Sequence, residues 1–318
     1  MQRRLLSEWG QNAIKLPYCG GHLWGEHRLS QRMGNADILT PAYAAAFEAF
    51  LKDHSERWRS LGAEERAFVY LWDEPEGRAE ELRMIAWLGR IVKQAAPGTA
   101  TLVAGDFDEA LAEVVDIFLQ DYSHPEVVKD AQARGTRFWW WGNAAFMPDM
   151  PGIDQRLRYG FESLQKGLLG AYSWGIGCYR ADGSGAVTDA EILQATWEKP
   201  EKWSKNSVVI YPGGVPQSEA PRLTPSISLE LSRDGIEDYD YAMMLAEHAE
   251  RLRVAGDHDR AAELDRLLQR AKGFYHEPQG RRTDFSAVDD LQALRDAIGS
   301  RLHALATPGS IRPGGTPQ

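Results

Sequence analysis

The sequence lacks the features that mark several common classes of protein. It has two cysteines, Cys19 and Cys178, which form no disulfide framework and show no Cys–His spacing typical of a metal site. The net charge of −10 is spread along the chain with no basic block, which argues against nucleic acid and anionic membranes as partners. No apolar run is long enough to span a bilayer, and the first residues do not form a signal peptide. We therefore expect no metal, no nucleic acid and no membrane span.

The composition instead indicates a globular protein with a substantial core. The chain has 318 residues, enough for one large domain or two ordinary ones, and 43% of them are hydrophobic. Its 11 tryptophans are many for this length. Tryptophan often stacks on the apolar face of a sugar ring, although most tryptophans are simply large core residues. The high tryptophan count is therefore consistent with a carbohydrate-binding site and equally with a large aromatic core.

One stretch, A-F-V-Y-L-W-D-E-P at residues 67–75, organises the rest of the chain. Its β-branched and aromatic residues predict a short strand, which Pro75 ends because proline cannot donate to a ladder. The strand therefore ends on Asp73 and Glu74. Acids at the carboxyl end of a strand lie where α/β folds place their active sites. In a pair of acids, one carboxyl group can hold a proton while the other stays ionised. The alternative is that both acids cap a helix beginning near Glu76.

Strand and helix patterns alternate over residues 13–211. Such alternation with short connections predicts βαβ crossovers and a parallel sheet. Apolar residues at helical spacing mark the helices, as in 78–95. The predicted strands are 13–18, 67–72, 101–104, 115–119, 137–142, 169–174 and 207–211, and the main helices between them are 41–60, 78–95, 124–134 and 154–167.

These seven strands predict an α/β fold of the (β/α)8 TIM-like barrel type. A closed barrel needs eight strands, and the chain opens on a helix at 2–12, so we expect the first strand to lie upstream of Met1. The alternative is an open doubly wound sheet. The absence of a G-x-G-x-x-G phosphate loop from the sequence argues against this alternative. From Ile236 onward the pattern is helical. We therefore expect a barrel over 1–231, a C-terminal helical region over 232–306 packed on it, and a disordered tail over 307–318.

A segment near the end of the predicted barrel carries a family resemblance. Residues 208–241 read V-V-I-Y-P-G-G, then P-S-I-S-L-E-L-S-R-D-G-I-E-D-Y-D-Y. This resembles the C-terminal signature of glycoside hydrolase family 123. The D-E-P triplet, the W-W-W-G-N run at 139–143 and the segment from Arg156 to Trp174 fall in the order of that family, so the resemblance spans about residues 13–245. Ser228 departs from the pattern, because the family usually has arginine there.

The resemblance implies a (β/α)8 barrel that removes terminal β-linked N-acetylgalactosamine from a glycan or glycolipid. It implies substrate-assisted retaining catalysis, in which the acetamido oxygen of the sugar attacks the anomeric carbon. Asp73 would then orient the acetamido group, and Glu74 would be the general acid and later the base. No cofactor or metal is implied. Relatives carry an upstream β-sandwich domain, which we expect to be absent from this chain. They are often exported, but no signal is present here and the compartment stays open.

Aromatic residues near the ends of the later strands would form the sugar platform. Placed against aromatic rings, the acid would be buried and its pKa raised. For each ring alone, core packing explains its presence equally well, and Trp140, which alternates with its neighbours, is expected to face the helices. The predicted substrate-binding residues are Tyr122, Trp139, Trp141, Trp174 and Tyr211.

The R-D-G-I-E-D-Y run is expected to be structural. In this interpretation Asp234 and Gly235 open a helix, acids lie in its first turn, and Arg233 ties the helix to the barrel. Two other functions stay open beside the glycosidase of family 123 type. One is a non-catalytic carbohydrate-binding relative. The other is a retaining glycosidase of different specificity, with Glu74 as the acid and Asp121 as a distant nucleophile.

Overall fold

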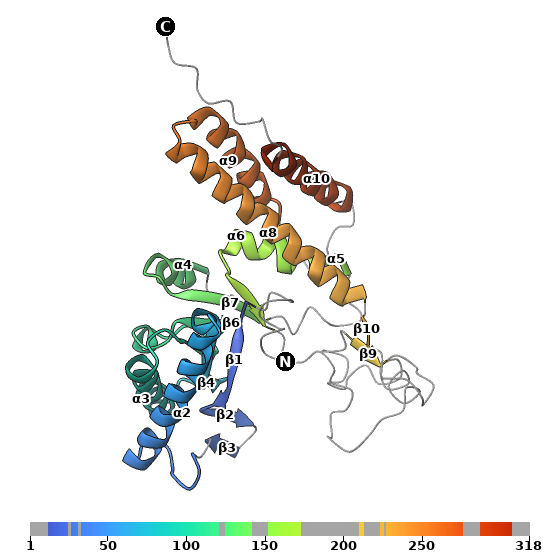
Figure 1. The fold of residues 1–318 in the computed structure, drawn as a ribbon. Coiled ribbons are helices and arrows are strands. Elements are labelled where there is room, and N and C mark those ends of the chain that lie inside the picture. The colour runs from blue at the N-terminus through green and yellow to red at the C-terminus, as the bar shows by residue number, and fades with distance from the viewer. Residues whose placement is uncertain are drawn as a thin grey trace, which may run out of the picture. The chain divides into compact units, whose positions relative to one another are not determined.

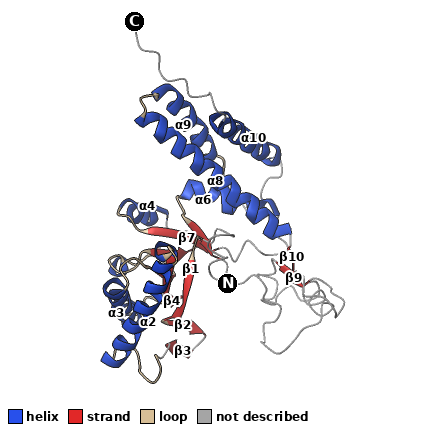
Figure 2. Cartoon of the chain, viewed as in Figure 1, coloured by secondary structure: helices blue, strands red, loops and turns tan. Residues whose placement is uncertain are grey.

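The computed structural model forms two compact units, Met1–Trp141 and Gly142–Gln318, which are described separately here. The boundaries expected near residues 231 and 306 stay a prediction. Figures 1 and 2 show the elements in chain order and by type. The described residues are 12–24, 27–30, 33–120, 125–141, 152–172, 210–212, 223–225, 227–275 and 287–306.

Six strands of the first unit run parallel in one sheet. β1 and β2 both pair with β4, whose other neighbour is β5, and β6 and β7 follow in order. A further strand, β3, turns back antiparallel to β2. The strands are β1 (Ile14–Cys19), β2 (Gly21–Trp24), β3 (His27–Ser30), β4 (Ala67–Asp73), β5 (Ala100–Ala104), β6 (Ile117–Gln120) and β7 (Arg137–Trp141).

The sheet of the first unit is strongly curled. Phe68 on β4 and Trp139 on β7 are three strands apart, which is roughly 14 Å in a flat sheet. Their ring centroids nevertheless lie 5.3 Å apart, so the two rings meet across a concave face. The sheet is therefore a half-barrel, and the expectation of a closed eight-strand TIM barrel is wrong for the described residues. Local sequence patterns predict β1 and β4 to β7 but miss β2 and β3, and closure depends on pairings between distant strands.

Helices cover the convex face of this half-barrel. Tyr18 of β1 stacks on Phe47 of α2 at a centroid distance of 4.4 Å. A Cβ at Gly20 would lie 2.6 Å from Leu88 of α3, so the missing side chain allows strand and helix to approach. Thr40 is the N-cap of α2, and its side chain accepts a hydrogen bond from the backbone N–H of Tyr43. The helices are α2 (Pro41–Ser60), α3 (Ala79–Ala95), α4 (Pro125–Ala133) and the short 3₁₀ turns η1 (Glu64–Arg66) and η2 (Glu109–Leu111).

The second unit is mainly helical. Its core consists of leucines and small residues from α8, α9 and α10 packed with Phe161. A helix expected at 154–167 is present but contains a turn of π-helix. The elements are α5 (Gly152–Leu157), η4 (Arg158–Glu162), α6 (Ser163–Lys166), β8 (Gly170–Tyr172), β9 (Ile210–Pro212), β10 (Leu223–Pro225), α8 (Ile227–Val254), α9 (His258–Lys272) and α10 (Ala287–Ala306).

Two expectations for this unit are corrected by the structure. The strand expected at 207–211 appears as β9, but it pairs antiparallel with β10 in a separate two-stranded sheet and is not a barrel strand. The helix expected to open at Asp234 begins at Ile227, so the acids of the R-D-G-I-E-D-Y run lie well inside it. Hydrophobic periodicity locates such a helix but does not fix where it begins.

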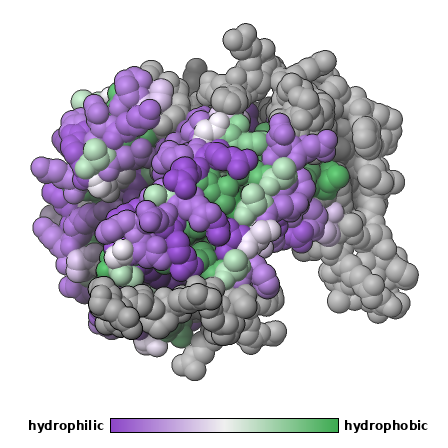
Figure 3. Space-filling model, turned by 90° about the horizontal axis from the view of Figure 1, so that it is seen from above, coloured by the Kyte–Doolittle hydropathy of each residue, from purple (hydrophilic) through white to green (hydrophobic). Residues whose placement is uncertain are grey.

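The described surface is mostly hydrophilic on the face shown in Figure 3. This agrees with a chain in which 26% of the residues are charged. Within the described parts of the chain, no helix combines the length and the apolar character that a bilayer crossing requires.

Candidate functional site

The Asp73–Glu74 pair lies at the carboxyl edge of the sheet, as predicted. Asp73 is the last residue of β4 and pairs in register with Ala104 of β5. The backbone N–H of Glu74 donates a 2.8 Å hydrogen bond to the carbonyl oxygen of Ala104. Glu74 has a φ of +48°, a left-handed conformation that is uncommon outside glycine. The neighbouring strand therefore holds the backbone of Glu74 in a conformation that the residue would not favour by itself.

The turn after Glu74 is held from two sides. A Cβ at Gly105 would lie 2.9 Å from Cδ of Pro75, so only glycine leaves room for the proline ring. The backbone N–H of Glu76 donates a 3.0 Å hydrogen bond to Oε2 of Glu81, a buried residue in the first turn of α3. The N-cap of α3 is Arg78. The position that caps this helix is thus occupied by neither Asp73 nor Glu74, which weakens the capping alternative.

Tyr70 contacts the carboxylate of Asp73. Its hydroxyl group donates a 2.5 Å hydrogen bond to Oδ1, the length typical of a hydroxyl group bound to an ionised carboxylate. Residues three apart in a regular strand point to opposite faces. Here the register of β4 against β5 shifts between Tyr70 and Trp72, and this bulge lets both side chains meet. Sequence reasoning missed Tyr70 because nothing in the local pattern marks the bulge.

The Tyr70 ring lies on the concave face of the half-barrel. Lys15 pairs in register with Phe68, and paired residues of parallel strands share a face. The Lys15 ammonium group lies 4.5 Å from the centroid of the Tyr70 ring. Because Phe68 meets Trp139 across the concave face, Lys15 and Tyr70 lie on that face as well. The Asp73 carboxylate, bound to the Tyr70 hydroxyl, is therefore reached from the same side as Trp139.

Of the predicted aromatic platform, the structure describes one side chain, Trp139, which is half-buried on the concave face. Register pairs place Asp73, Ala104, Leu119 and Trp139 in one row across four strands, but the sheet is curled and the Trp139 ring meets Phe68 near the amino end of β4. Trp140 is 3% exposed, which confirms its predicted place in the core. The side chains of Tyr122, Trp141, Trp174 and Tyr211, and the alternative nucleophile Asp121, lie outside the described residues.

The burial expected around the general acid is not found. Glu74 is exposed and Asp73 is half-buried. The strand-end position that the sequence predicts correctly also brings Glu74 to the rim of the sheet. The described aromatic residues do not enclose Glu74, so a bound sugar would itself have to exclude water from it.

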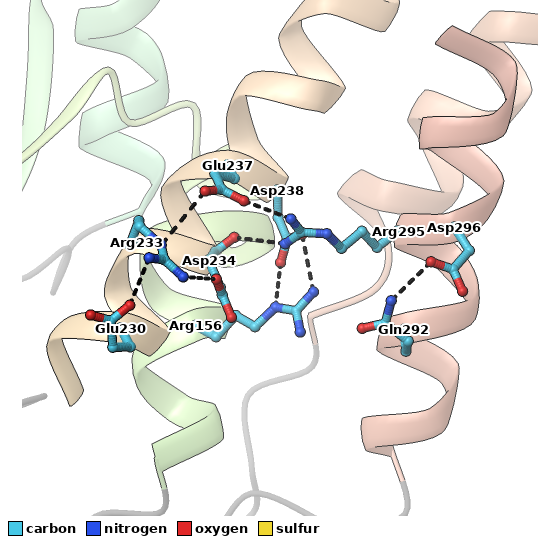
Figure 4. A network of polar contacts seen from close by, with 9 residues as sticks. All are labelled: Arg156, Glu230, Arg233, Asp234, Glu237, Asp238, Gln292, Arg295 and Asp296. Atoms are coloured by element: carbon cyan, nitrogen blue, oxygen red, sulfur yellow. Dashed lines mark hydrogen bonds and ion pairs between the residues drawn. The ribbon is translucent and has the colours of Figure 1, made fainter. Parts of the chain in front are cut away.

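The R-D-G-I-E-D-Y run forms a structural network in the second unit (Figure 4). Asp238 is 1% exposed and accepts hydrogen bonds from Arg156 Nε at 2.6 Å and Arg295 Nη1 at 2.9 Å. A Cβ at Gly235 would lie 2.4 Å from the carbonyl oxygen of Arg156, so this glycine brings α8 against α5. The expected structural role is confirmed for these residues.

Arg233 differs from its expected role. Its described ion pairs are with Glu230, Asp234 and Glu237, all on α8 itself, and its side chain is 63% exposed. It therefore stabilises its own helix, and the expectation that it ties this helix to the barrel is wrong.

Comparison with known proteins gives a distant structural similarity. No family model and no curated protein matches the chain. A solved structure matches it with a TM-score of 0.54 and 12% sequence identity, over 87% of this chain and 48% of the other. That structure is described as a family 123 glycoside hydrolase from Clostridium perfringens, studied for glycolipid glycan hydrolysis. The chain thus spans about half the length of this neighbour and is similar to it in fold.

The similarity agrees with the family that the sequence resembles. At this identity it supports a distant relationship in fold and leaves substrate and mechanism to be argued from the residues. In the part of the chain that the structure describes, no group of three or more His, Cys, Asp and Glu side chains could hold a metal ion.

Proposed function

We propose that the chain is a glycosidase that removes terminal β-linked N-acetylgalactosamine, with the acetamido group of the substrate as the nucleophile. The observation that carries this proposal is the Asp73–Glu74 pair at the carboxyl edge of a half-barrel similar in fold to a family 123 glycoside hydrolase. Adjacent acids at a strand end can reach two different atoms of one sugar ring, because the backbone turns between them.

The two acids would have different tasks in the first step. The acetamido oxygen forms a bond to the anomeric carbon, and the bond from that carbon to the leaving oxygen breaks. Glu74, protonated at the start, gives its proton to the leaving oxygen, so the aglycone departs as an alcohol. Asp73 accepts a hydrogen bond from the acetamido N–H and stabilises the positive charge that grows on this group as the cyclic oxazolinium forms.

The second step reverses these roles. Water attacks the anomeric carbon and gives a proton to the Glu74 carboxylate, while the bond to the acetamido oxygen breaks. The sugar is released with its original anomeric configuration, and Glu74 is again protonated. Its exposed position at the sheet rim suits this exchange, since the same carboxyl group must meet both the aglycone and water.

A panel of chromogenic substrates tests the proposal. We expect nitrophenyl β-N-acetylgalactosaminide to be hydrolysed and the corresponding β-galactoside, which lacks the acetamido group, to be hydrolysed much more slowly. A thiazoline analogue of N-acetylgalactosamine should inhibit, because it mimics the cyclic intermediate.

Other outcomes would contradict the proposal in distinct ways. Equal hydrolysis of both glycosides without thiazoline inhibition would favour a retaining glycosidase with an enzyme carboxylate as nucleophile. Binding of N-acetylgalactosamine, measured by calorimetry, with no hydrolysis of any substrate would favour a carbohydrate-binding protein.

A further inference from the structure

We propose that Tyr70, supported by Lys15, is a positioning residue that fixes the plane of the Asp73 carboxylate for the acetamido group. This inference rests on the proposed function, because it assigns Asp73 the task of receiving the acetamido N–H. Its structural basis is the 2.5 Å hydrogen bond from the Tyr70 hydroxyl group to Oδ1 of Asp73 and the ammonium group of Lys15 over the Tyr70 ring.

An aspartate side chain needs such a partner if its direction matters. The last torsion of aspartate is broad and roughly two-fold, so an unbound carboxylate rotates over a wide range. One short hydrogen bond to Oδ1 fixes the plane of the group and thereby the direction of Oδ2. In the described part of the chain Oδ2 has no protein hydrogen-bond partner, which leaves it for a substrate donor.

The bulge in β4 allows the hydrogen bond between Tyr70 and Asp73 to form. Without the register shift between Tyr70 and Trp72, residues 70 and 73 would point to opposite faces of the sheet. The shift is anchored by the carbonyl oxygen of Leu71, which accepts a 3.0 Å hydrogen bond from the backbone N–H of Gly20. Bulges recur beside functional sites because they redirect a side chain at small cost in pairing.

Lys15 strengthens the donor. Its ammonium group lies 4.5 Å from the centroid of the Tyr70 ring, within the range of a cation–π interaction. A positive charge over the ring draws electron density from the phenol, so the hydroxyl group becomes a better donor to a carboxylate. Tyr70 itself is 5% exposed, which shields its bond to Asp73 from competing water.

The test compares Tyr70→Phe with a matched control, Tyr43→Phe. Tyr43 is also buried, and its hydroxyl group lies 2.8 Å from that of Tyr18 on the convex side, away from Asp73. We expect Tyr70→Phe to lower kcat/KM for the N-acetylgalactosaminide about ten- to a hundred-fold. The fall should be the same for nitrophenyl and alkyl leaving groups, as for Asp73→Asn. Affinity for the thiazoline analogue should fall in parallel, whereas Tyr43→Phe should change only the melting temperature.

A double-mutant cycle tests the part assigned to Lys15. Lys15→Met should lower kcat/KM about two- to five-fold in the wild-type background and have no effect in the Tyr70→Phe background. An equal effect in both backgrounds would overturn the assigned link between Lys15 and Tyr70.

The remaining outcomes separate this inference from the proposed function. If the wild-type chain is active and kcat/KM of Tyr70→Phe lies within two-fold of kcat/KM of Tyr43→Phe, the role of Tyr70 is overturned and the proposed function stands. A wild-type chain that neither hydrolyses the N-acetylgalactosaminide nor binds the thiazoline would overturn the proposed function, and the role of Tyr70 with it.

Discussion

At the scale of single residues, Glu74 stands out because it combines a carboxylate with a left-handed backbone. For a residue with a Cβ this conformation costs about 1–2 kcal/mol relative to the right-handed one. Strain of this kind persists where the surrounding structure imposes it, and it accumulates at functional sites. The hydrogen bond from Glu74 to Ala104 and the ring of Pro75 against Gly105 impose it here.

We therefore expect Glu74→Gly to abolish hydrolysis while leaving the free energy of unfolding unchanged or raising it by up to about 1 kcal/mol. Leu39→Gly is the control, because Leu39 also has a positive φ, of +66°, but lies in the loop before α2. It should have the same effect on stability with full activity. Thermal melting and the nitrophenyl assay check both variants, and a marked loss of stability in Glu74→Gly would show that the side chain of Glu74 supports the fold.

Gly235 provides a second prediction at this scale. An added Cβ would lie 2.4 Å from the carbonyl oxygen of Arg156, a backbone atom that cannot move aside easily. Gly235→Ala should therefore lower the free energy of unfolding by about 1–3 kcal/mol, despite the higher helix propensity of alanine. Gly299→Ala in α10 is the control, because nothing lies within 4 Å of its Cβ position and stability should rise. Equal gains in melting temperature for both variants would contradict the close approach of α8 and α5.

At the scale of elements, local pattern predicted most strands and helices but not their exact geometry. The strand 67–72 and the helix 78–95 appear as β4 and α3 with one bound of each shifted by one residue, because the strand is a continuous apolar run and the helix is strongly periodic. The bulge in β4 could not be predicted, since it depends on pairing with β1 and β5. Thus Asp73 and Glu74 could be found from sequence, whereas Tyr70 required the register.

An ion pair joins Lys93 of α3 to Asp116 in the β5–β6 connection, and it predicts a pH-dependent stability. Asp116 accepts hydrogen bonds from Lys93 Nζ at 2.5 Å and from the backbone N–H of Thr101 at 2.8 Å. Burial raises the pKa of Asp116, but these donors and the charge of Lys93 outweigh burial, and the pKa is lowered overall. A carboxyl group with a lowered pKa stabilises the fold above its unfolded-state pKa, and this contribution is lost as the pH falls through the folded-state value.

Asp116→Asn should accordingly lower the free energy of unfolding by about 1–3 kcal/mol at neutral pH. The difference from the wild type should shrink as the pH falls below about 4, the usual aspartate value, towards the lowered folded-state pKa, because the unfolded chain takes up the proton first. Glu109→Gln is the control, because Glu109 pairs with Arg134 at the surface, where solvent screens the charges, and should change stability little. Urea denaturation at several pH values measures the difference, and a constant loss over the whole range would contradict the assigned charge interaction.

At the scale of the whole molecule, the parallel α/β class was predictable and the closure of the sheet was not. Strand–helix alternation fixes the class because each crossover is local. Closure needs pairing between the first and last strands, and the last predicted strand, 207–211, instead forms β9 in a separate sheet with β10. The concave face is nonetheless formed by β4 and β7, whose rings Phe68 and Trp139 meet. A half-barrel is thus sufficient to bring Asp73 and Trp139 to the same concave face.

The central claim is that Asp73 and Glu74 divide the work of one reaction on an N-acetylgalactosaminide. The most direct test measures kcat/KM of Asp73→Asn and Glu74→Gln with a nitrophenyl and an alkyl leaving group. Glu74→Gln should lose about 10²- to 10⁴-fold with the alkyl group, which needs a proton to depart, and far less with nitrophenyl. Asp73→Asn should lose similarly with both, because the acetamido group must attack in either case. Equal losses for both variants with both leaving groups, or no loss in either variant, would contradict the account.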